Sequence, residues 1–576
     1  MMTGMGRSPA GRPDQAGRPD QAAKPGQAAP KTRGAHAAAK PARTRRAAPL
    51  PAVRIPAVRI PAVPLPAVPE PRRPDPGDVM APARYGLAHA MRSAAADAAA
   101  ALVVAVVVPL AMLQLPDAIA WAIPARFADA GPGAVTSLLR ASGLALTAMA
   151  IAVPCGGLAV RRFRAWPVLI GGLAIVAAAD VLGNTARTIG QIGLDRSLHG
   201  AGAGIALAAA IALAAERRNR TGRRNRAGHA IAGWWAASAV AGLACASELM
   251  RHRLETGDWH AALQPYPWLT GVALGVAALY AVLAEGTVTA STRNDFPAAE
   301  RSLLAQLAVP VAGMCVVAIA VTYGRSEAVT AAAIAEALSL AALAVATARA
   351  GTARWFAVAC AVTGFTVAPA AGAATDLMRA RTFTGALTLD RFGHFVLTEP
   401  ELCGIALCGA ALCGAAVAIV LPVRWVRRVT GAGLLVAAAG YVAGYATGPR
   451  SQLLAAVCVP VAAGLAAALA AGLRATGAPG AMCGGVLMLA GVLTGYLADG
   501  ALELREVDNA DGTAAAVHNA LLASDLRWNL AAAAVTAVAG LAAIASAQVR
   551  HRHESSAPLP LASAPPAVLS AGRGAE

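Results

Sequence analysis

Long apolar runs recur along most of this 576-residue sequence, from Ala98 almost to the C-terminus. Each run holds about 18 to 25 residues, which is the length that a helix needs to cross a hydrocarbon layer of roughly 30 Å. Only 14% of the residues are charged, so the chain lacks the polar surface that a soluble protein of this size requires. A membrane barrel would show short alternating segments instead. The sequence therefore predicts an all-α polytopic membrane protein.

Run length and flanking residues predict fourteen transmembrane helices. Their expected limits are 98–122, 134–158, 166–185, 194–215, 228–249, 266–285, 303–323, 327–348, 354–374, 401–422, 428–447, 451–473, 479–499 and 528–548.

The connections between these helices alternate in charge. Short basic segments fall on alternate connections, at Arg161 to Arg164, Glu216 to Arg226 and Arg424 to Arg428, whereas the loop from Leu502 mixes signs. Basic loops remain in the cytoplasm, and an even number of spans returns the chain to the side on which it began. We therefore expect a multi-pass protein of the cytoplasmic membrane with both termini in the cytoplasm.

Residues 1–85 differ from the rest in being rich in proline and arginine and in containing the repeat PAVRI. Such a segment is expected to be a disordered, basic cytoplasmic tail with polyproline character. The tail could contact anionic lipid, or it could be solvated without a specific partner; a translation start at Met80 or Met91 would omit it. It lacks the pattern of a signal peptide. Residues 549–576 are expected to form a second disordered cytoplasmic tail.

The chemistry of enzymes and metal sites is not apparent in the sequence. The nine cysteines show no metal-ligand spacing and are interpreted as small apolar residues. No loop combines a nucleophile with a base or forms a phosphate-binding turn. We therefore expect no enzymatic activity, no metal, no cofactor and no nucleic acid partner. The expected partners are the lipid bilayer, a small-molecule substrate and protons.

Acidic residues inside the predicted spans are candidates for proton binding, because burial favours the neutral form of a carboxyl group. Asp180 lies in the outer half of the third span, and Glu336 lies close to the middle of the eighth. A structural role is equally compatible with both. Asp499 and Glu248 fall near the ends of spans, where a solvated carboxylate is the simpler interpretation.

Local motifs go further than hydropathy. The segment Gly156 to Ala165 reads GGLAVRRFRA and resembles the G-x-L-A-D-R-x-G-R-R turn of the major facilitator superfamily. Gly156, Arg161, Arg162 and Arg164 are the candidate residues of this gating turn. Val160 replaces the family's aspartate and Phe163 its second glycine, so the charge network of the family must be altered here.

The following spans resemble the fourteen-helix drug/proton antiporter branch of that superfamily. The fourth carries Arg196, Gly200 and Gly202 in the order of the R-x-x-Q-G-x-G-A motif, and Gly242 lies in the region of the antiporter motif of the fifth, which lacks its proline. The glycines imply close helix packing. Arg196 could pair with a carboxylate and relay protons, or it could extend to lipid headgroups beside Asp195. Asp117 is displaced by two residues from the family's aspartate in the first span.

The resemblance implies a major facilitator fold with an N-terminal six-helix half at 98–285, a central extra helix pair at 303–348 and a C-terminal six-helix half at 354–548. A substrate cavity would lie between the halves. The implied function is secondary active transport, as proton-coupled efflux of a small amphipathic compound. The altered motifs leave one alternative open, a transport-inactive relative that acts as a membrane sensor or scaffold.

Overall fold

The computed structural model describes residues 82–116, 132–219, 226–256, 259–264, 266–285, 298–321, 324–349, 354–382, 399–447, 454–510 and 513–556. Asp117, residues 1–81 of the first predicted tail and residues 557–576 of the second lie outside these ranges. The predictions for them therefore remain predictions.

The regular structure of the described residues is helical. The helices before the predicted second half are α1 (Pro82–Met112), α3 (Pro132–Ser142), α4 (Leu144–Arg162), α5 (Ala165–Gly183), α6 (Ile189–Asn219), α7 (Arg226–Thr256), η3 (Trp259–Ala262), α8 (Pro267–Glu285), α9 (Ala298–Val321) and α10 (Ser326–Arg349). They are followed by α11 (Arg354–Thr382), α12 (Glu399–Val420), η4 (Val423–Trp425), α13 (Val426–Thr447), α14 (Leu454–Ala475), α15 (Ala478–Asp508) and α16 (Ala514–Ser556).

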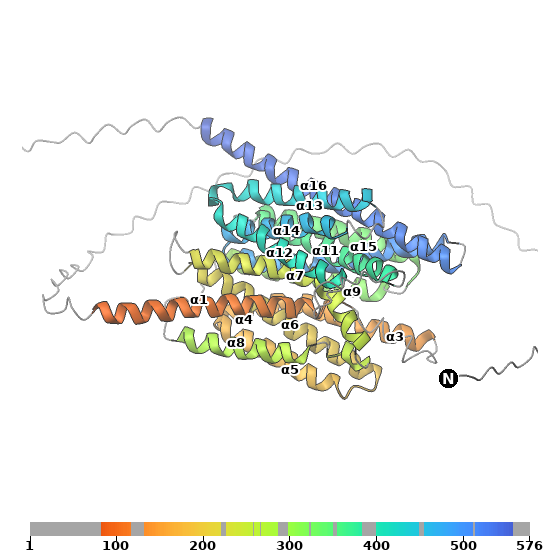
Figure 1. Cartoon of the computed structure of the whole chain (residues 1–576), viewed down its shortest axis with the longest axis horizontal. Helices are drawn as coiled ribbons and strands as arrows, with labels where there is room; N and C mark the ends of the chain where they lie inside the picture. The colour runs from red at the N-terminus through yellow and green to blue at the C-terminus, as the bar shows by residue number, and fades with distance from the viewer. Residues whose placement is uncertain are drawn as a thin grey trace, which may run out of the picture. The chain divides into compact units, whose positions relative to one another are not determined.

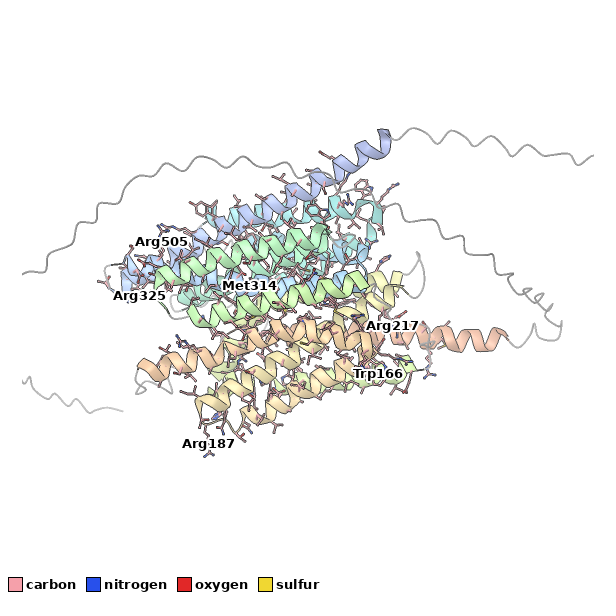
Figure 2. The ribbon with its side chains drawn as sticks, turned by 180° about the vertical axis from the view of Figure 1, so that it is seen from behind. Trp166, Arg187, Arg217, Met314, Arg325 and Arg505 are labelled. Atoms are coloured by element: carbon pink, nitrogen blue, oxygen red, sulfur yellow. The ribbon has the colours of Figure 1, made fainter. Side chains whose placement is uncertain are left out.

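Fourteen helices of the described residues are long and apolar enough to cross a membrane, with α3 and α4 together forming one of them. This number confirms the prediction. The helices run approximately along one direction (Figure 1). Arg217 and Trp166 lie near one end of the bundle, and Arg187, Arg325 and Arg505 lie near the opposite end (Figure 2). Helix α5, which runs from Trp166 towards Arg187, and helix α6, which ends beside Arg217, are therefore antiparallel.

Several helix boundaries differ from the predicted ones: α11 continues to Thr382, α15 to Asp508, α16 begins at Ala514, and α1 and α16 also extend into the predicted tails. Helix α1 begins at Pro82 and ends at Met112, whereas the predicted span was 98–122 and the predicted tail ended at residue 85. Helix α16 continues to Ser556, beyond the predicted end at 548. The extension of α1 contains several alanines, and the extension of α16 contains arginine and glutamate. These residues favour a helix, but the two segments are not apolar enough for a membrane core. Hydropathy therefore predicts which residues cross the membrane, but it does not predict where a helix ends.

Helix packing repeats between the two halves. In the first, α1 packs against α7 and α8, α6 against α4 and α5, and α5 against α8. In the second, α11 packs against α15 and α16, α14 against α12 and α13, and α13 against α16. These are the same pairings between helices at equivalent positions, with α9 and α10 lying between the two sets in the chain. The described residues therefore contain two sets of six helices with the same pattern of pairings, which is the arrangement expected for the two predicted halves.

The contact between the halves follows the same symmetry. Helix α7 packs against α12 and α14, and its counterpart α15 packs against α4 and α6. The central helices α9 and α10 both contact α15, and α9 also contacts α4. Trp235 of α7 and Phe356 of α11 meet across this contact with ring centroids 5.8 Å apart. The fifth helix of each half thus holds the two units together.

Glycine pairs mark equivalent helix crossings in both halves. A Cβ atom added to Gly202 of α6 would lie 2.7 Å from the carbonyl oxygen of Gly172 on α5. In the second half, Gly433 of α13 and Gly464 of α14 approach each other in the same way. Small residues permit such close contact, which stabilises helix pairs in lipid through van der Waals packing.

Substitution of Gly202 by alanine is therefore expected to destabilise the first half by about 1–3 kcal/mol, the usual cost of overpacking. The added methyl group would meet the backbone of Gly172 and Val176, which cannot rotate away. Gly171→Ala is the matched control, because a Cβ atom there meets nothing within 4 Å. The unfolding temperature in detergent should fall for Gly202→Ala and not for the control. Equal unfolding temperatures would contradict this close packing.

Candidate functional site

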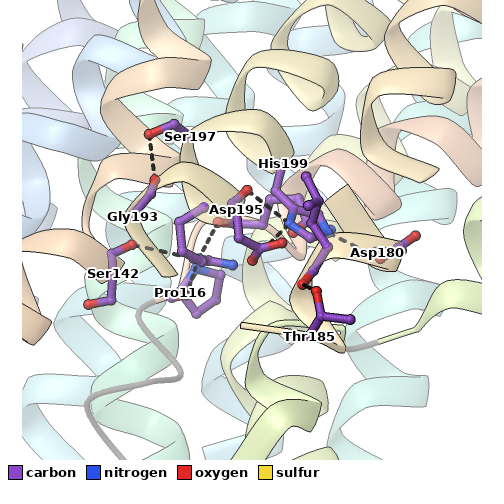
Figure 3. Close-up of polar contacts among 11 residues, drawn as sticks. Pro116, Ser142, Asp180, Thr185, Gly193, Asp195, Ser197 and His199 are labelled. Carbon is purple, nitrogen blue, oxygen red and sulfur yellow. Dashed lines mark hydrogen bonds and ion pairs between the residues drawn. The ribbon is translucent and has the colours of Figure 1, made fainter. Parts of the chain in front are cut away.

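Four charged or titratable side chains are buried together where α5 ends and α6 begins. Asp180 lies on α5, and Asp195, Arg196 and His199 lie on α6. All four are buried. Figure 3 shows His199 between Asp180 and Asp195. We name these four residues the α5/α6 charge cluster.

His199 contacts both carboxylates through opposite ring nitrogens. Its Nε2 lies 3.1 Å from Oδ1 of Asp180. Its Nδ1 lies 3.4 Å from Oδ2 of Asp195 and 3.2 Å from the backbone oxygen of the same residue. Both nitrogens therefore face oxygen atoms. When the carboxyl groups are ionised, these oxygens accept hydrogen bonds and have no proton to donate.

This geometry favours the imidazolium form of His199. A neutral imidazole carries one N–H only, so either tautomer would direct a lone pair at an oxygen acceptor. The charge sum leads to the same result. Arg196 contributes one positive charge and the two aspartates contribute two negative charges, so a proton on His199 brings the buried cluster to zero. A proton on His199 therefore fits both the hydrogen-bond geometry and the charge balance of the α5/α6 charge cluster.

Arg196 joins three helices at this site. Its guanidinium donates hydrogen bonds to the backbone oxygens of Gln114 at 3.0 Å, Pro116 at 3.2 Å and Ser142 at 3.4 Å. These residues follow α1 and end α3, and only 1% of the arginine is exposed. The lipid headgroup alternative considered for Arg196 does not fit this inward position.

Asp195 fits into a narrow space beside a glycine. A Cβ atom added to Gly183 would lie 3.2 Å from Oδ1 of Asp195 and also 3.2 Å from Cγ of Gln264.

On the neighbouring face of α6 a hollow of about 420 Å³ opens between α3, α4, α6 and Ile319 of α9. Its polar lining residues are Ser137, Arg140 and Ser197. It adjoins the first half and is not the predicted cavity between the halves, which remains a prediction.

Comparison with known proteins gives structural neighbours only. No protein-family model matches the chain, and no curated protein matches it significantly. Among similar solved structures, a proton:xylose symporter of the major facilitator superfamily is 12% identical, covering 78% of this chain and 95% of its own with a TM-score of 0.46. The human organic anion transporter is 13% identical, covering 78% and 99% with a TM-score of 0.48. A bacterial homologue of the human drug peptide transporters is 13% identical, covering 79% and 99% with a TM-score of 0.49.

The segment predicted as a gating turn is mostly helical. Gly156 lies inside α4, which continues through Arg161 and Arg162, and only Phe163 and Arg164 separate it from α5. Gly156 also falls inside the predicted span 134–158, so its helical position agrees with that span, and the gating role of the segment remains a prediction. A Cβ atom there would approach Ala208 and Ile205 of α6, so Gly156 belongs to a helix crossing. Val160, in the place of the family's aspartate, is buried.

The remaining candidates have other positions and contacts in the fold. Gly200 faces the carbonyl of Ala145 on α4, and Gly242 faces Met112 and Pro109 of α1. Glu336 is buried in α10. Asp499 was expected to be solvated, yet it is only 8% exposed. This expectation was wrong because α15 extends to Asp508 and holds this position inside the bundle.

Two members of the cluster, His199 and Asp195, were not among the predicted coupling residues. The spacing of Asp195 and His199 is i, i+4, which places both side chains on one face of a helix. That spacing was the available signal. A second ion pair was also missed, in which the buried Arg217 lies 2.9 Å from Oδ1 of Asp97 and donates to the Tyr280 hydroxyl at 3.2 Å. Asp97 falls just outside the predicted first span.

Proposed function

We propose that this protein is a secondary active transporter, which exports a small amphipathic molecule in exchange for protons. The observation that carries the proposal is the α5/α6 charge cluster, a buried site that accommodates one proton inside a membrane-spanning helix. Ionisable residues buried within membrane-spanning segments are costly and are characteristic of proton and ion pathways.

The repeated helix packing also supports this proposal. Transporters that expose a site to alternate sides of the membrane are commonly built from two structural repeats that move against each other. The two halves here have equivalent pairings and meet through equivalent helices, α7 and α15. The small-molecule partner, the efflux direction and the exchange for protons come from the motif resemblance. Assignment to the fourteen-helix antiporter branch is part of the same proposal.

Transport is tested with the full chain in proteoliposomes that carry an imposed pH gradient. We expect substrate-dependent proton flux, and Asp180→Asn should lower it by about tenfold or more, since positioned proton-transfer groups contribute at least that much. Without Asp180, Arg196 and Asp195 already balance, so His199 no longer needs a proton. Asp508→Asn, an exposed position on α15, is the matched control and should leave the flux unchanged.

The same measurement distinguishes transport from the alternative function. If no compound from a broad lipophilic panel produces flux, the protein is better described as a transport-inactive membrane sensor or scaffold. If flux persists unchanged in Asp180→Asn, proton coupling does not pass through the α5/α6 charge cluster.

A further inference from the structure

Another buried acid lies in the central helix pair, far along the chain from the α5/α6 charge cluster. Glu336 of α10 is 2% exposed. Neither of its carboxyl oxygens has a hydrogen-bond partner among the described residues. Burial of an unpaired polar group is unfavourable, so this side chain does not stabilise the observed packing.

Apolar residues precede and follow Glu336 on its face of α10. Val329, Ala332 and Ala333 lie one to two turns before it and pack in a cluster with Leu497 and Ala501 of α15. Leu340 follows one turn later and belongs to the main core. Residues four apart lie on the same helix face. Glu336 therefore occupies a position in an apolar stripe that packs on α15.

The charged surroundings of Glu336 are sparse. Helices α9, α11 and α15 pack against α10. From α9, the buried thiol of Cys315 lies within electrostatic range of the carboxyl group. On α15, Asp499 lies within electrostatic range of Glu503 and of Asp525 on α16. No basic side chain described on these helices forms an ion pair with Glu336.

An ionised carboxylate in this place would lack any counter-charge, at an effective cost of several kcal/mol. The neutral acid avoids that cost. A hard metal cation would require several oxygen ligands, and no group of three or more histidine, cysteine or acidic residues in the described chain could hold a metal. The proton is therefore the ligand that fits.

We propose that Glu336 is a second proton-binding site, which is neutral while α9, α10 and α15 are packed together and releases its proton when they separate. The inference rests on the proposed function for the use made of this proton. It assigns the central helix pair a part in coupling, because loss of the proton would leave a charge that opposes renewed packing of α10 on α15.

The test is modification of the purified full-length protein by dicyclohexylcarbodiimide, which reacts with protonated carboxyl groups in apolar membrane sites. Mass spectrometry should find the adduct on the peptide that contains Glu336 at acidic pH, and labelling should decline as pH rises. Glu336→Gln should abolish the adduct on this peptide. Asp180→Asn should retain it, since the two acids lie in different parts of the fold.

Three results would overturn the inference: no adduct at Glu336 at any pH, labelling that does not vary with pH, or protection by sodium ions, which would indicate a sodium site instead. If Glu336→Gln fails to fold, Glu336→Leu replaces it, because the surrounding stripe is apolar. Labelling requires no transport, so the two proposals can fail separately. An adduct without flux would contradict the proposed function and support the proton site at Glu336. Flux without an adduct would support the proposed function and contradict the proton site.

Discussion

Replacement of His199 by glutamine is expected to abolish proton-driven flux while substrate exchange at equal pH on both sides continues. Glutamine can donate to one of the two carboxylates, but it cannot take up and release a proton. A fall of at least about 100-fold is expected, as for loss of a positioned proton-transfer group. Proton flux and counterflow of the same substrate in proteoliposomes separate the loss of coupling from the loss of transport.

The charge sum supplies two controls for this variant. His199→Gln leaves one unbalanced negative charge in the cluster, and this charge could reduce stability. The double variant His199→Gln with Asp195→Asn restores the balance between Arg196 and Asp180, so it should fold well and still lack coupling. His518→Gln, an exposed position on α16, should behave as the unmodified protein. Proton-driven flux in the folded double variant would show that His199 does not carry the coupled proton.

The sequence was sufficient to predict the fold class and the number of spans, because both follow from the length of apolar runs. It was poor at showing the repeat. The basic turn near Arg424 only weakly resembles the one near Arg161, whereas the pairs Gly172 with Gly202 and Gly433 with Gly464 mark equivalent crossings clearly. A glycine's partner lies on another helix. The role of such a glycine in helix packing is therefore visible only once the structure shows which helix lies against it.

The candidate site was predicted only in part, because the contacts that form it also lie between helices. Asp180 and Arg196 were identified from depth and motif, but whether they act with one another depended on what lay between α5 and α6. His199 occupies that position through a contact with Asp180 that spans two helices. Depth also misled for Asp499, since hydropathy placed it at a solvated end that the structure buries. Cross-helix contacts, rather than local patterns, determine which acids are paired.

Arg196 is expected to matter most for folding. Arg196→Gln removes the positive charge of the α5/α6 charge cluster and the donors to the carbonyl groups of Gln114, Pro116 and Ser142. Breaking a buried charge arrangement from one side costs about 3–5 kcal/mol. The variant should therefore give a low yield and a reduced unfolding temperature in detergent. Arg196→Lys should be intermediate, since lysine keeps the charge but lacks the planar fork that reaches several acceptors.

A double-mutant cycle distinguishes the lost charge from the lost hydrogen bonds. Arg196→Gln with Asp195→Asn leaves Asp180 and protonated His199, whose charges cancel, but it does not restore the three donors. The double variant should consequently be more stable than Arg196→Gln alone and less stable than the unmodified protein. If the two substitutions instead destabilise additively, Arg196 and Asp195 are not coupled. The charge balance that places a proton on His199 would then lose its basis, although the link between α1, α3 and α6 would remain.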